Sequence, residues 1–338
     1  MGALNLRKAS RYLFAAILMA WIFYWVPFGA TSQAIAEAST GYLSLAFAFG
    51  VTTLGLRVAR WLIWVDFASQ PHQSLARRPL IVAYLTSTLY GVVTIGRLGE
   101  LWKAKSLCDK GWPWQSALGL VVLERVLDVG VILAVLAGAA LVVGGVAPAG
   151  IGIALTIALL MAWPCLGERS VHLMATTVRP IAGKLAPKFM LNLATPMVQL
   201  GTDMARPKEY GWIMGLTLSG WLTYVATLIA VATSLGLSVS WTVLGLLGIL
   251  GALCSVIPIT WNGLGLRELM YIHYLAREGI PEHVAVSMSF LFFSVFLLVS
   301  VVFGLIGFGA HRGSTALDVG GDLRQRFEGR PVGLYRFK

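Results

Sequence analysis

The chain has 338 residues, of which 57% are hydrophobic and 12% are charged, and its mean hydropathy is +0.78. A soluble domain contains about 45–50% apolar and about 25% charged residues, so this composition excludes an ordinary soluble protein and indicates a polytopic membrane protein. The net charge of +11 does not indicate nucleic-acid binding, because the basic residues fall in loops, where they set membrane orientation and meet anionic lipid headgroups.

The N-terminal part of the chain predicts two spans. The first is the apolar run Tyr12–Phe28, which follows a basic segment and ends in the aromatic sequence WIFYWVPF, as a retained span does at the membrane interface. The basic flank places the N-terminus in the cytoplasm; the alternative is a signal peptide that is cleaved near Ala34–Ala38. The second span is Gly41–Phe67, and Arg57 and Arg60 near its far end place that end in the cytoplasm.

The next apolar run, Pro79–Ile95, has only about 17 residues and is broken by Gly91, with Gly96 directly after it. Both of its flanks are basic, so a full crossing would leave one basic cluster on the wrong side of the membrane. A re-entrant hairpin that enters from the cytoplasm and returns avoids this conflict. Non-helical backbone at that depth is tolerated inside protein or beside a cavity.

The remainder of the chain predicts four further spans and a second hairpin. The second hairpin, Trp241–Ile259, is again short and rich in glycine, with Pro258 at its end. The basic segment Gly167–Tyr210 and the basic tail 311–338 are predicted to be cytoplasmic. The predicted fold is an all-α polytopic membrane protein with about six full transmembrane helices and two re-entrant helical hairpins, in one integral-membrane domain, residues 1–310. The four later spans are Trp114–Val143, Ile151–Leu166, Gly211–Leu235 and Ala285–Gly309.

The two hairpins belong to an internal repeat. An offset of 168 residues places repeat 2, about 209–311, on repeat 1, about 41–143. Three full spans separate the hairpins, so the hairpins enter from opposite faces and the repeat is inverted. Inverted repeats with short, Gly/Pro-interrupted segments are typical of secondary transporters, whose substrate site lies near the membrane midplane; the alternative is a duplication retained only for packing. The matching pairs are Glu100/Glu268, Leu101/Leu269, Leu107/Leu275, Gly111/Gly279, Pro113/Pro281 and Ala117/Ala285.

Each hairpin is followed by a basic and an acidic residue. Arg97 and Glu100 stand three residues apart, on one face of a helix, and are predicted to pair. Arg267 and Glu268 are adjacent, so we expect that they do not face each other and that one of them has a partner elsewhere.

The sequence LERVLD places three further ionisable residues inside a span. Glu124 and Asp128 share a helix face and Arg125 is the local cation, so a second cation is needed, which Arg97 or Arg267 could supply. An arginine left over in such a cluster is suited to a phosphate, which its planar fork binds through two oxygens. The alternative is a set of structural ion pairs that join hairpins to spans. The predicted translocation cluster is Arg97, Glu100, Glu124, Arg125, Asp128, Arg267 and Glu268.

Glycines at the hairpin elbows are a weaker signal. Gly263 and Gly265 precede a predicted helix, whose backbone N–H groups could bind an anion. The cysteines are dispersed and no catalytic or metal-ligand spacing is present, so neither a metal nor a cofactor is expected. The predicted backbone elbow positions are Gly96, Gly99, Pro258, Gly263 and Gly265.

The sequences GRLGELWKAKSL, VVLERVLD and IPITWNGLGLRELMYIHYLAREGI resemble the integral-membrane domain of lysylphosphatidylglycerol synthases and its stand-alone, flippase-like relatives, over roughly Gly41–Gly309. Where this family usually has Arg, the chain has Lys103, which keeps the positive charge. The resemblance implies translocation of a phospholipid, a polyprenyl-linked lipid or a hopanoid- or glycolipid-type lipid between leaflets. The aminoacyl-transferase domain of the full-length synthases is not expected here, nor is enzymatic activity. The motif residues are Gly96, Gly99, Glu100, Glu124, Arg125, Asp128, Pro258, Gly263, Gly265 and Glu268.

We therefore expect a lipid translocase in the inner (cytoplasmic) membrane, with both termini in the cytoplasm and a lipid with an anionic phosphate headgroup as its partner. One alternative is a non-catalytic subunit or scaffold of a lipid-modifying or glycan-assembly enzyme. Another is an integral-membrane enzyme or a carrier of small solutes. The oligomeric state is left open by the sequence.

Overall fold

The computed structural model describes residues 20–22, 24, 26–68, 75–144, 207–256 and 260–327. Most of the first predicted span, the span Ile151–Leu166, nearly all of the segment Gly167–Tyr210, and Pro258 lie outside the described residues. The described part is helical throughout and contains no strand. In chain order its elements are α2 (Phe28–Ala36), α3 (Thr40–Ala68), α4 (Arg77–Val93), the 3-10 helix η1 (Ile95–Leu101), α5 (Trp102–Cys108), α6 (Trp114–Gly144), α10 (Pro207–Ser234), α11 (Trp241–Val256), the 3-10 helix η2 (Trp261–Gly263), α12 (Leu266–Ala276) and α13 (Glu282–Phe327).

Three of the described helices are long and apolar enough to cross a membrane, namely the segments Thr40–Ala68, Gly211–Ser234 and Glu282–Ala310. The apolar segment Trp241–Ser255 is shorter than a span, as predicted for the second hairpin. An all-helical fold with three candidate membrane spans among the described residues is thus confirmed. The total of six spans and the re-entrant course of the hairpins stay predictions.

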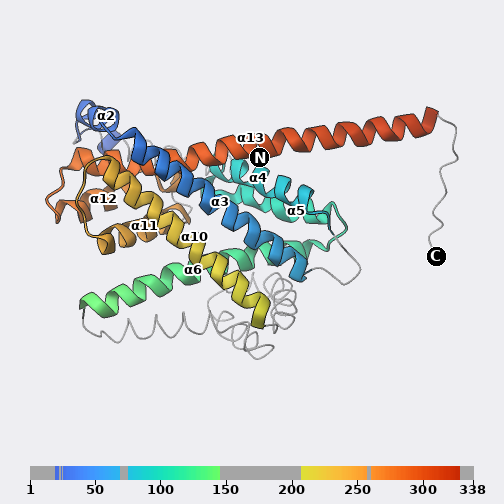
Figure 1. The fold of residues 1–338 in the computed structure, drawn as a ribbon, viewed down its shortest axis with the longest axis horizontal. Coiled ribbons are helices and arrows are strands. Elements are labelled where there is room, and N and C mark those ends of the chain that lie inside the picture. The colour runs from blue at the N-terminus through green and yellow to red at the C-terminus, as the bar shows by residue number, and fades with distance from the viewer. Residues whose placement is uncertain are drawn as a thin grey trace, which may run out of the picture.

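Helices α3 and α10, which correspond at the offset of 168, pack side by side and run in opposite directions (Figure 1). The backbone N–H of Ser39, next to the start of α3, donates to the carbonyl oxygen of Ser234, at the end of α10, at 2.8 Å. Further along, Thr53 Oγ1 donates to Thr223 Oγ1 at 2.8 Å. Antiparallel packing of corresponding helices is the arrangement that an inverted repeat requires.

Both broken segments, α4–η1–α5 and α11–η2–α12, end in the same backbone motif. Trp112 N–H donates to Leu107 O at 3.2 Å, and 168 residues later Ile280 N–H donates to Leu275 O at 3.0 Å. Gly111 precedes the first of these donors with φ of 89°, and its counterpart has φ of 73°. These are Schellman motifs, which need a residue that adopts the left-handed region. The leucine and glycine matches in the sequence therefore reflect two identical helix ends.

The two breaks meet each other inside the protein. Val92 O, at the end of α4, accepts hydrogen bonds from Trp261 Nε1 and Asn262 Nδ2 in η2, both at 2.8 Å. On the other side of the first break, η1 folds tightly back on α4, because a Cβ on Gly99 would lie only 2.2 Å from the carbonyl carbon of Tyr90. The elbow predicted at Gly99 is therefore a close approach of two backbone segments.

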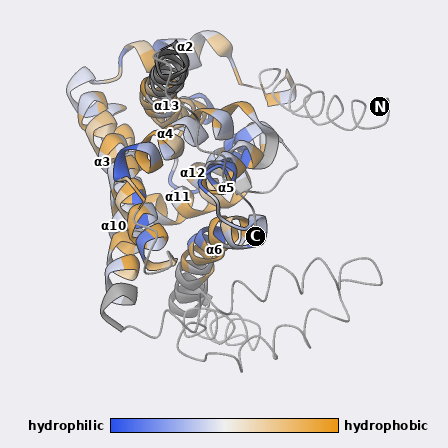
Figure 2. Cartoon of the chain, turned by 90° about the vertical axis from the view of Figure 1, so that its right-hand side faces the viewer, coloured by the Kyte–Doolittle hydropathy of each residue, from blue (hydrophilic) through white to orange (hydrophobic). Residues whose placement is uncertain are grey.

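Hydrophilic residues gather on α3 and around α5 and α12, toward the middle of the molecule, whereas the surrounding helices are largely hydrophobic (Figure 2). Helix α13 packs on α4 and then extends well beyond the other helices (Figure 1). Its 46 residues span about 69 Å, more than twice the thickness of the ~30 Å hydrocarbon core. The helix thus continues past the predicted end of the last span at Gly309.

Candidate functional site: a buried ionic core beside an arginine-lined cavity

Arg60 of α3 is the centre of a buried ion-pair network with α6. It is 2% exposed, and its Nη1 lies 2.7 Å from Asp128 Oδ1. Its Nη2 lies 3.2 Å from Asp128 Oδ2 and 3.1 Å from Glu124 Oε1. Thr217 Oγ1 of α10 accepts a further hydrogen bond from Nη1 at 3.2 Å. Arg60 is therefore the additional cation that the sequence analysis required for Glu124 and Asp128.

This finding corrects one prediction. The second cation is Arg60 and not Arg97 or Arg267. Arg60 was predicted only as a marker of the cytoplasmic end of its span, and α3 continues for eight residues beyond it, to Ala68. Its side chain meets α6 inside the protein instead.

Lys103 of α5 joins the same network from the first hairpin. It is 0% exposed, and its Nζ lies 2.5 Å from Glu124 Oε2 and 3.7 Å from Glu100 Oε2. The ammonium also lies over the rings of Trp61 and Tyr84, 5.0 and 4.6 Å from their centroids. A buried ammonium needs such partners because it loses its hydration. Lys103 thus anchors the hairpin on α6.

Glu100 connects this network to two less buried arginines. Arg97 Nε lies 2.9 Å from Glu100 Oε1, which confirms the predicted pair, although the N–H is not directed along a hydrogen bond. Arg125 contacts Glu100 Oε2 and lies 3.7 Å from Asp128 Oδ2. The arginine side chains are 28% and 30% exposed, against 7% for Glu100.

Arg267 and Glu268 pair with each other, so the expectation that adjacent residues do not face each other is wrong here. Arg267 Nη2 lies 2.6 Å from Glu268 Oε1. Both residues turn toward Ser289 of α13, whose Oγ accepts from Arg267 Nε at 2.7 Å and donates to Glu268 Oε1 at 2.8 Å. Gly265 N–H donates to Glu268 Oε2 at 2.6 Å. That N–H group, predicted as an anion ligand together with Gly263, is therefore already satisfied.

A cavity of about 90 Å³ lies between the two halves, and residues of α3, α4, η1, α6, α10, α11, η2, α12 and α13 line it. Four arginines line this cavity, which we call the cavity arginines. Of the seven predicted cluster residues, Glu100 and three of these arginines line the cavity, whereas Glu124, Asp128 and Glu268 lie behind it as ion-pair partners. The cavity arginines are Arg57, Arg97, Arg125 and Arg267.

Arg57 was not predicted as a site residue. It lines the cavity from α3 and makes no ion pair with any residue that the structure describes. The available signal was its position one helical turn before Arg60, which places both on one face of α3.

The charges around the cavity do not balance. The described network and cavity lining contain six basic and four acidic side chains, so positive charge is in excess. An uncompensated charge away from water is costly, and this one is positioned to bind an anion. The basic residues are Arg57, Arg60, Lys103, Arg97, Arg125 and Arg267, and the acidic residues are Glu100, Glu124, Asp128 and Glu268.

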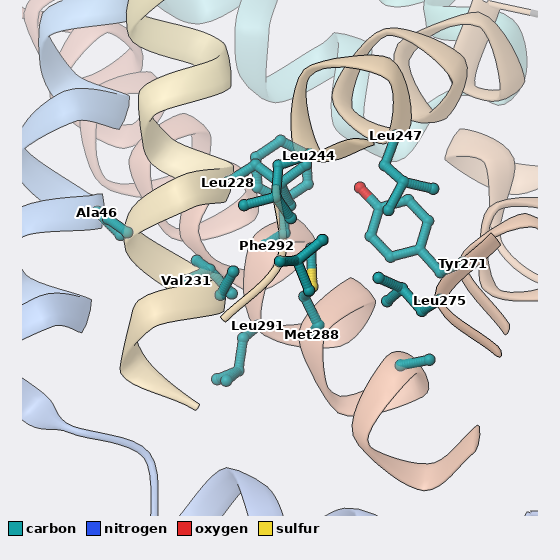
Figure 3. Close-up of a cluster of buried hydrophobic side chains, with 14 of the residues drawn as sticks. Ala46, Leu228, Val231, Leu244, Leu247, Tyr271, Leu275, Met288, Leu291 and Phe292 are labelled. Atoms are coloured by element: carbon teal, nitrogen blue, oxygen red, sulfur yellow. The ribbon is translucent and has the colours of Figure 1, made fainter. Parts of the chain in front are cut away.

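The ionic core, defined as Arg60, Lys103, Glu124 and Asp128, exists only in the first half. At the offset of 168 the second half has an apolar cluster instead, and Figure 3 labels Leu228, Tyr271 and Phe292 among its members. Both arrangements fill equivalent positions between corresponding helices. The corresponding pairs are Arg60/Leu228, Lys103/Tyr271, Glu124/Phe292 and Asp128/Phe296.

Arg97 adopts a backbone conformation that favours glycine. Its φ is 55°, and its counterpart at the offset of 168 is Gly265, with φ of 86°. A side chain in the left-handed region costs about 1–2 kcal/mol. Such strain is typical of functional positions, because the surrounding structure must stabilise it. The first half thus retains a strained arginine at the edge of the cavity, where the second half has glycine.

The family model for the lysylphosphatidylglycerol synthase TM region matches residues 9–304. The match covers most of the chain, and the protein belongs to this family. A comparison with individually curated proteins found no match.

Proposed function

We propose that this member of the lysylphosphatidylglycerol synthase TM-region family binds the phosphate headgroup of an anionic lipid in its arginine-lined cavity and moves the lipid between leaflets. The lipid is a phospholipid, a polyprenyl-linked lipid or a hopanoid- or glycolipid-type lipid. The observation that carries the proposal is the excess of arginine over carboxylate around a cavity in the interior of a membrane protein. Arginine binds phosphate oxygens through two parallel N–H groups, which suits it better than lysine to this task.

The surface next to the cavity favours a lipid over a soluble anion. Val93 and Leu98 are each 62% exposed, and their chain neighbours Val92 and Arg97 line the cavity. Phe293 lines it as well, 4.9 Å from the guanidinium of Arg267. A charged cavity whose lining residues have exposed apolar chain neighbours matches an amphiphile, because its headgroup and chains need different surroundings.

The proposed role is binding and transfer without a chemical step. Glu100 is the one carboxylate among the described residues that line the cavity, and it is paired with Arg97 and Arg125. Both oxygens of this carboxylate are engaged by arginines, so the geometry favours an ion-pairing role.

A leaflet-resolved assay in proteoliposomes tests the proposal. A fluorescent phosphatidylglycerol is incorporated, and a membrane-impermeant reductant bleaches the outer leaflet, so transfer appears as loss of the protected fraction. Arg97→Gln and Arg267→Gln are expected to slow transfer about tenfold or more, because each removes a charged hydrogen bond to phosphate worth about 1.5–3 kcal/mol.

The matched control is Arg277→Gln, which removes the same charge from an exposed residue, the C-cap directly after the end of α12. It is expected to transfer the lipid at the wild-type rate. Equal transfer by the wild type and both cavity variants, or no transfer above protein-free vesicles, would refute the proposal.

A further inference from the structure

Glu100 is the point where the ionic core and the cavity meet. Its Oε1 lies 2.9 Å from Arg97 Nε, and its Oε2 contacts Arg125. The same Oε2 is 3.7 Å from Lys103 Nζ. Gly91 of α4 provides the space for this side chain, since a Cβ there would lie 2.9 Å from Glu100 Cγ. One carboxylate therefore occupies the guanidinium groups of two of the four cavity arginines.

We infer that Glu100 is an internal competitor of the ligand, whose carboxylate holds the phosphate position of the empty cavity and exchanges with the headgroup when a lipid binds. This inference rests on the proposed function. A carboxylate and a phosphate use the same N–H groups of an arginine, so both cannot have Arg97 and Arg125 fully at the same time. Binding of an anionic headgroup requires release of Glu100.

The structure provides a second partner for the released carboxylate. Lys103 belongs to the ionic core and does not line the cavity, its Nζ lies 3.7 Å from Glu100 Oε2, and its ammonium has three donors. Movement of the carboxylate toward Lys103 would shorten the present distance of 3.7 Å to a hydrogen bond. The displaced charge therefore stays paired, and exchange does not leave a buried carboxylate alone.

Exchange also defines the ligand class. A zwitterionic headgroup brings a cation into a cavity that already has an excess of positive charge, so it competes poorly with Glu100. A headgroup with a net negative phosphate can replace the carboxylate. The site therefore selects anionic over zwitterionic phospholipids.

The test is calorimetric titration of the detergent-solubilised full-length protein with short-chain dihexanoyl phosphatidylglycerol. Glu100→Gln removes the competitor and is expected to bind about tenfold more tightly than the wild type. The matched control is Glu124→Gln, which removes the same charge from the same network but touches none of the cavity arginines. It is expected to give no gain. Arg97→Gln is expected to bind at least tenfold more weakly.

The outcomes separate the inference from the proposed function. Loss of binding in Arg97→Gln together with unchanged or weaker binding in Glu100→Gln overturns the inference and leaves the proposed function intact. An equal gain in Glu100→Gln and Glu124→Gln overturns it too, because the effect is then net charge. Unchanged binding in Arg97→Gln overturns both. If Glu100→Gln does not fold, Glu100→Asp replaces it in the titration, because its side chain is shorter and its carboxylate lies farther from the arginines. The inference then requires that Glu100→Asp bind the lipid more tightly than the wild type.

Parallel titrations identify the source of the phosphate. Dihexanoyl phosphatidylcholine is expected to bind at least tenfold more weakly than the glycerol lipid to the wild type, and the inference fails if the two bind equally. Inorganic phosphate is expected to bind weakly and to gain in the same ratio in Glu100→Gln. A preference of the wild type for free phosphate over the lipid would contradict a lipid site.

Discussion

The ion pair between Arg60 and Asp128 allows a quantitative test of the buried network. Arg60→Leu introduces the residue that the second half has at the corresponding position, Leu228. It removes three hydrogen bonds to carboxylates and leaves Glu124 and Asp128 with Lys103 and a distant Arg125. Breaking one side of a buried pair typically costs 3–5 kcal/mol, so we expect a loss of about 4 kcal/mol in the free energy of unfolding.

The double variant is expected to cost about as much as Arg60→Leu alone, and therefore less than the two single changes together. Asp128→Leu alone should cost about 2–3 kcal/mol, because Arg60 keeps its contact with Glu124. In Arg60→Leu/Asp128→Leu, Glu124 and Lys103 still form a pair, and two apolar side chains replace the lost one. The cost of the double variant should therefore be below the sum of the single costs by about 2–3 kcal/mol.

Unfolding by sodium dodecyl sulfate in mixed micelles, followed by circular dichroism, measures all four free energies. The matched control is Arg77→Leu with Asp66→Leu, an exposed pair at 3.5 Å, for which coupling near zero is expected. Additive costs for Arg60 and Asp128, or a cost below about 1 kcal/mol for Arg60→Leu, would show that the pair is not buried as described.

Three other changes test the backbone and the topology. Gly99→Ala should lower the free energy of unfolding by about 1–3 kcal/mol, because its Cβ collides with the backbone of α4. The control Gly215→Ala should be neutral or stabilising, because no atom lies within 4 Å of a Cβ there. Equal effects of the two changes would contradict the close approach of η1 to α4. Arg97→Gly should be more stable than Arg97→Ala by about 1 kcal/mol in the same unfolding assay, owing to its positive φ. In a cysteine-free background, Lys105→Cys and His273→Cys, exposed positions 168 residues apart, should react with impermeant maleimide from opposite sides of the membrane; labelling from one side rules out the inverted repeat.

The sequence repeat predicted more of the fold than hydropathy did. Leu107, Gly111 and their counterparts at the offset of 168 match because each pair builds the same helix end. The short apolar runs were recognisable as broken segments because a glycine or proline interrupts them. The long continuation of α13 was not predicted, since its C-terminal turns are polar and have no apolar periodicity that distinguishes a helix from a tail.

For the site, the sequence indicated that a cation was missing beside Glu124 and Asp128, but not which residue supplies it. Two carboxylates and one arginine in LERVLD showed that a cation was missing. Arg60 is 64 and 68 residues away from the two carboxylates, and its local context is that of a span boundary. The pairing of Arg267 with Glu268 depends on Ser289 of another helix, which no rule of helical spacing includes. Contacts of this kind are set by packing between helices.

The core of the first half is ionic and the corresponding core of the second half is apolar, so the two halves of the molecule are not equivalent. A protein made of two copies of the second half would retain the antiparallel helices and the matching hairpin ends, but it would lack the ionic core of Arg60, Lys103, Glu124 and Asp128. A protein made of two copies of the first half would bury a second ionic core, at the cost of removing four more charged side chains from water. The two halves are therefore not interchangeable. If a lipid passes between these halves as proposed, it meets an ionic core on one side of its path and an apolar core on the other.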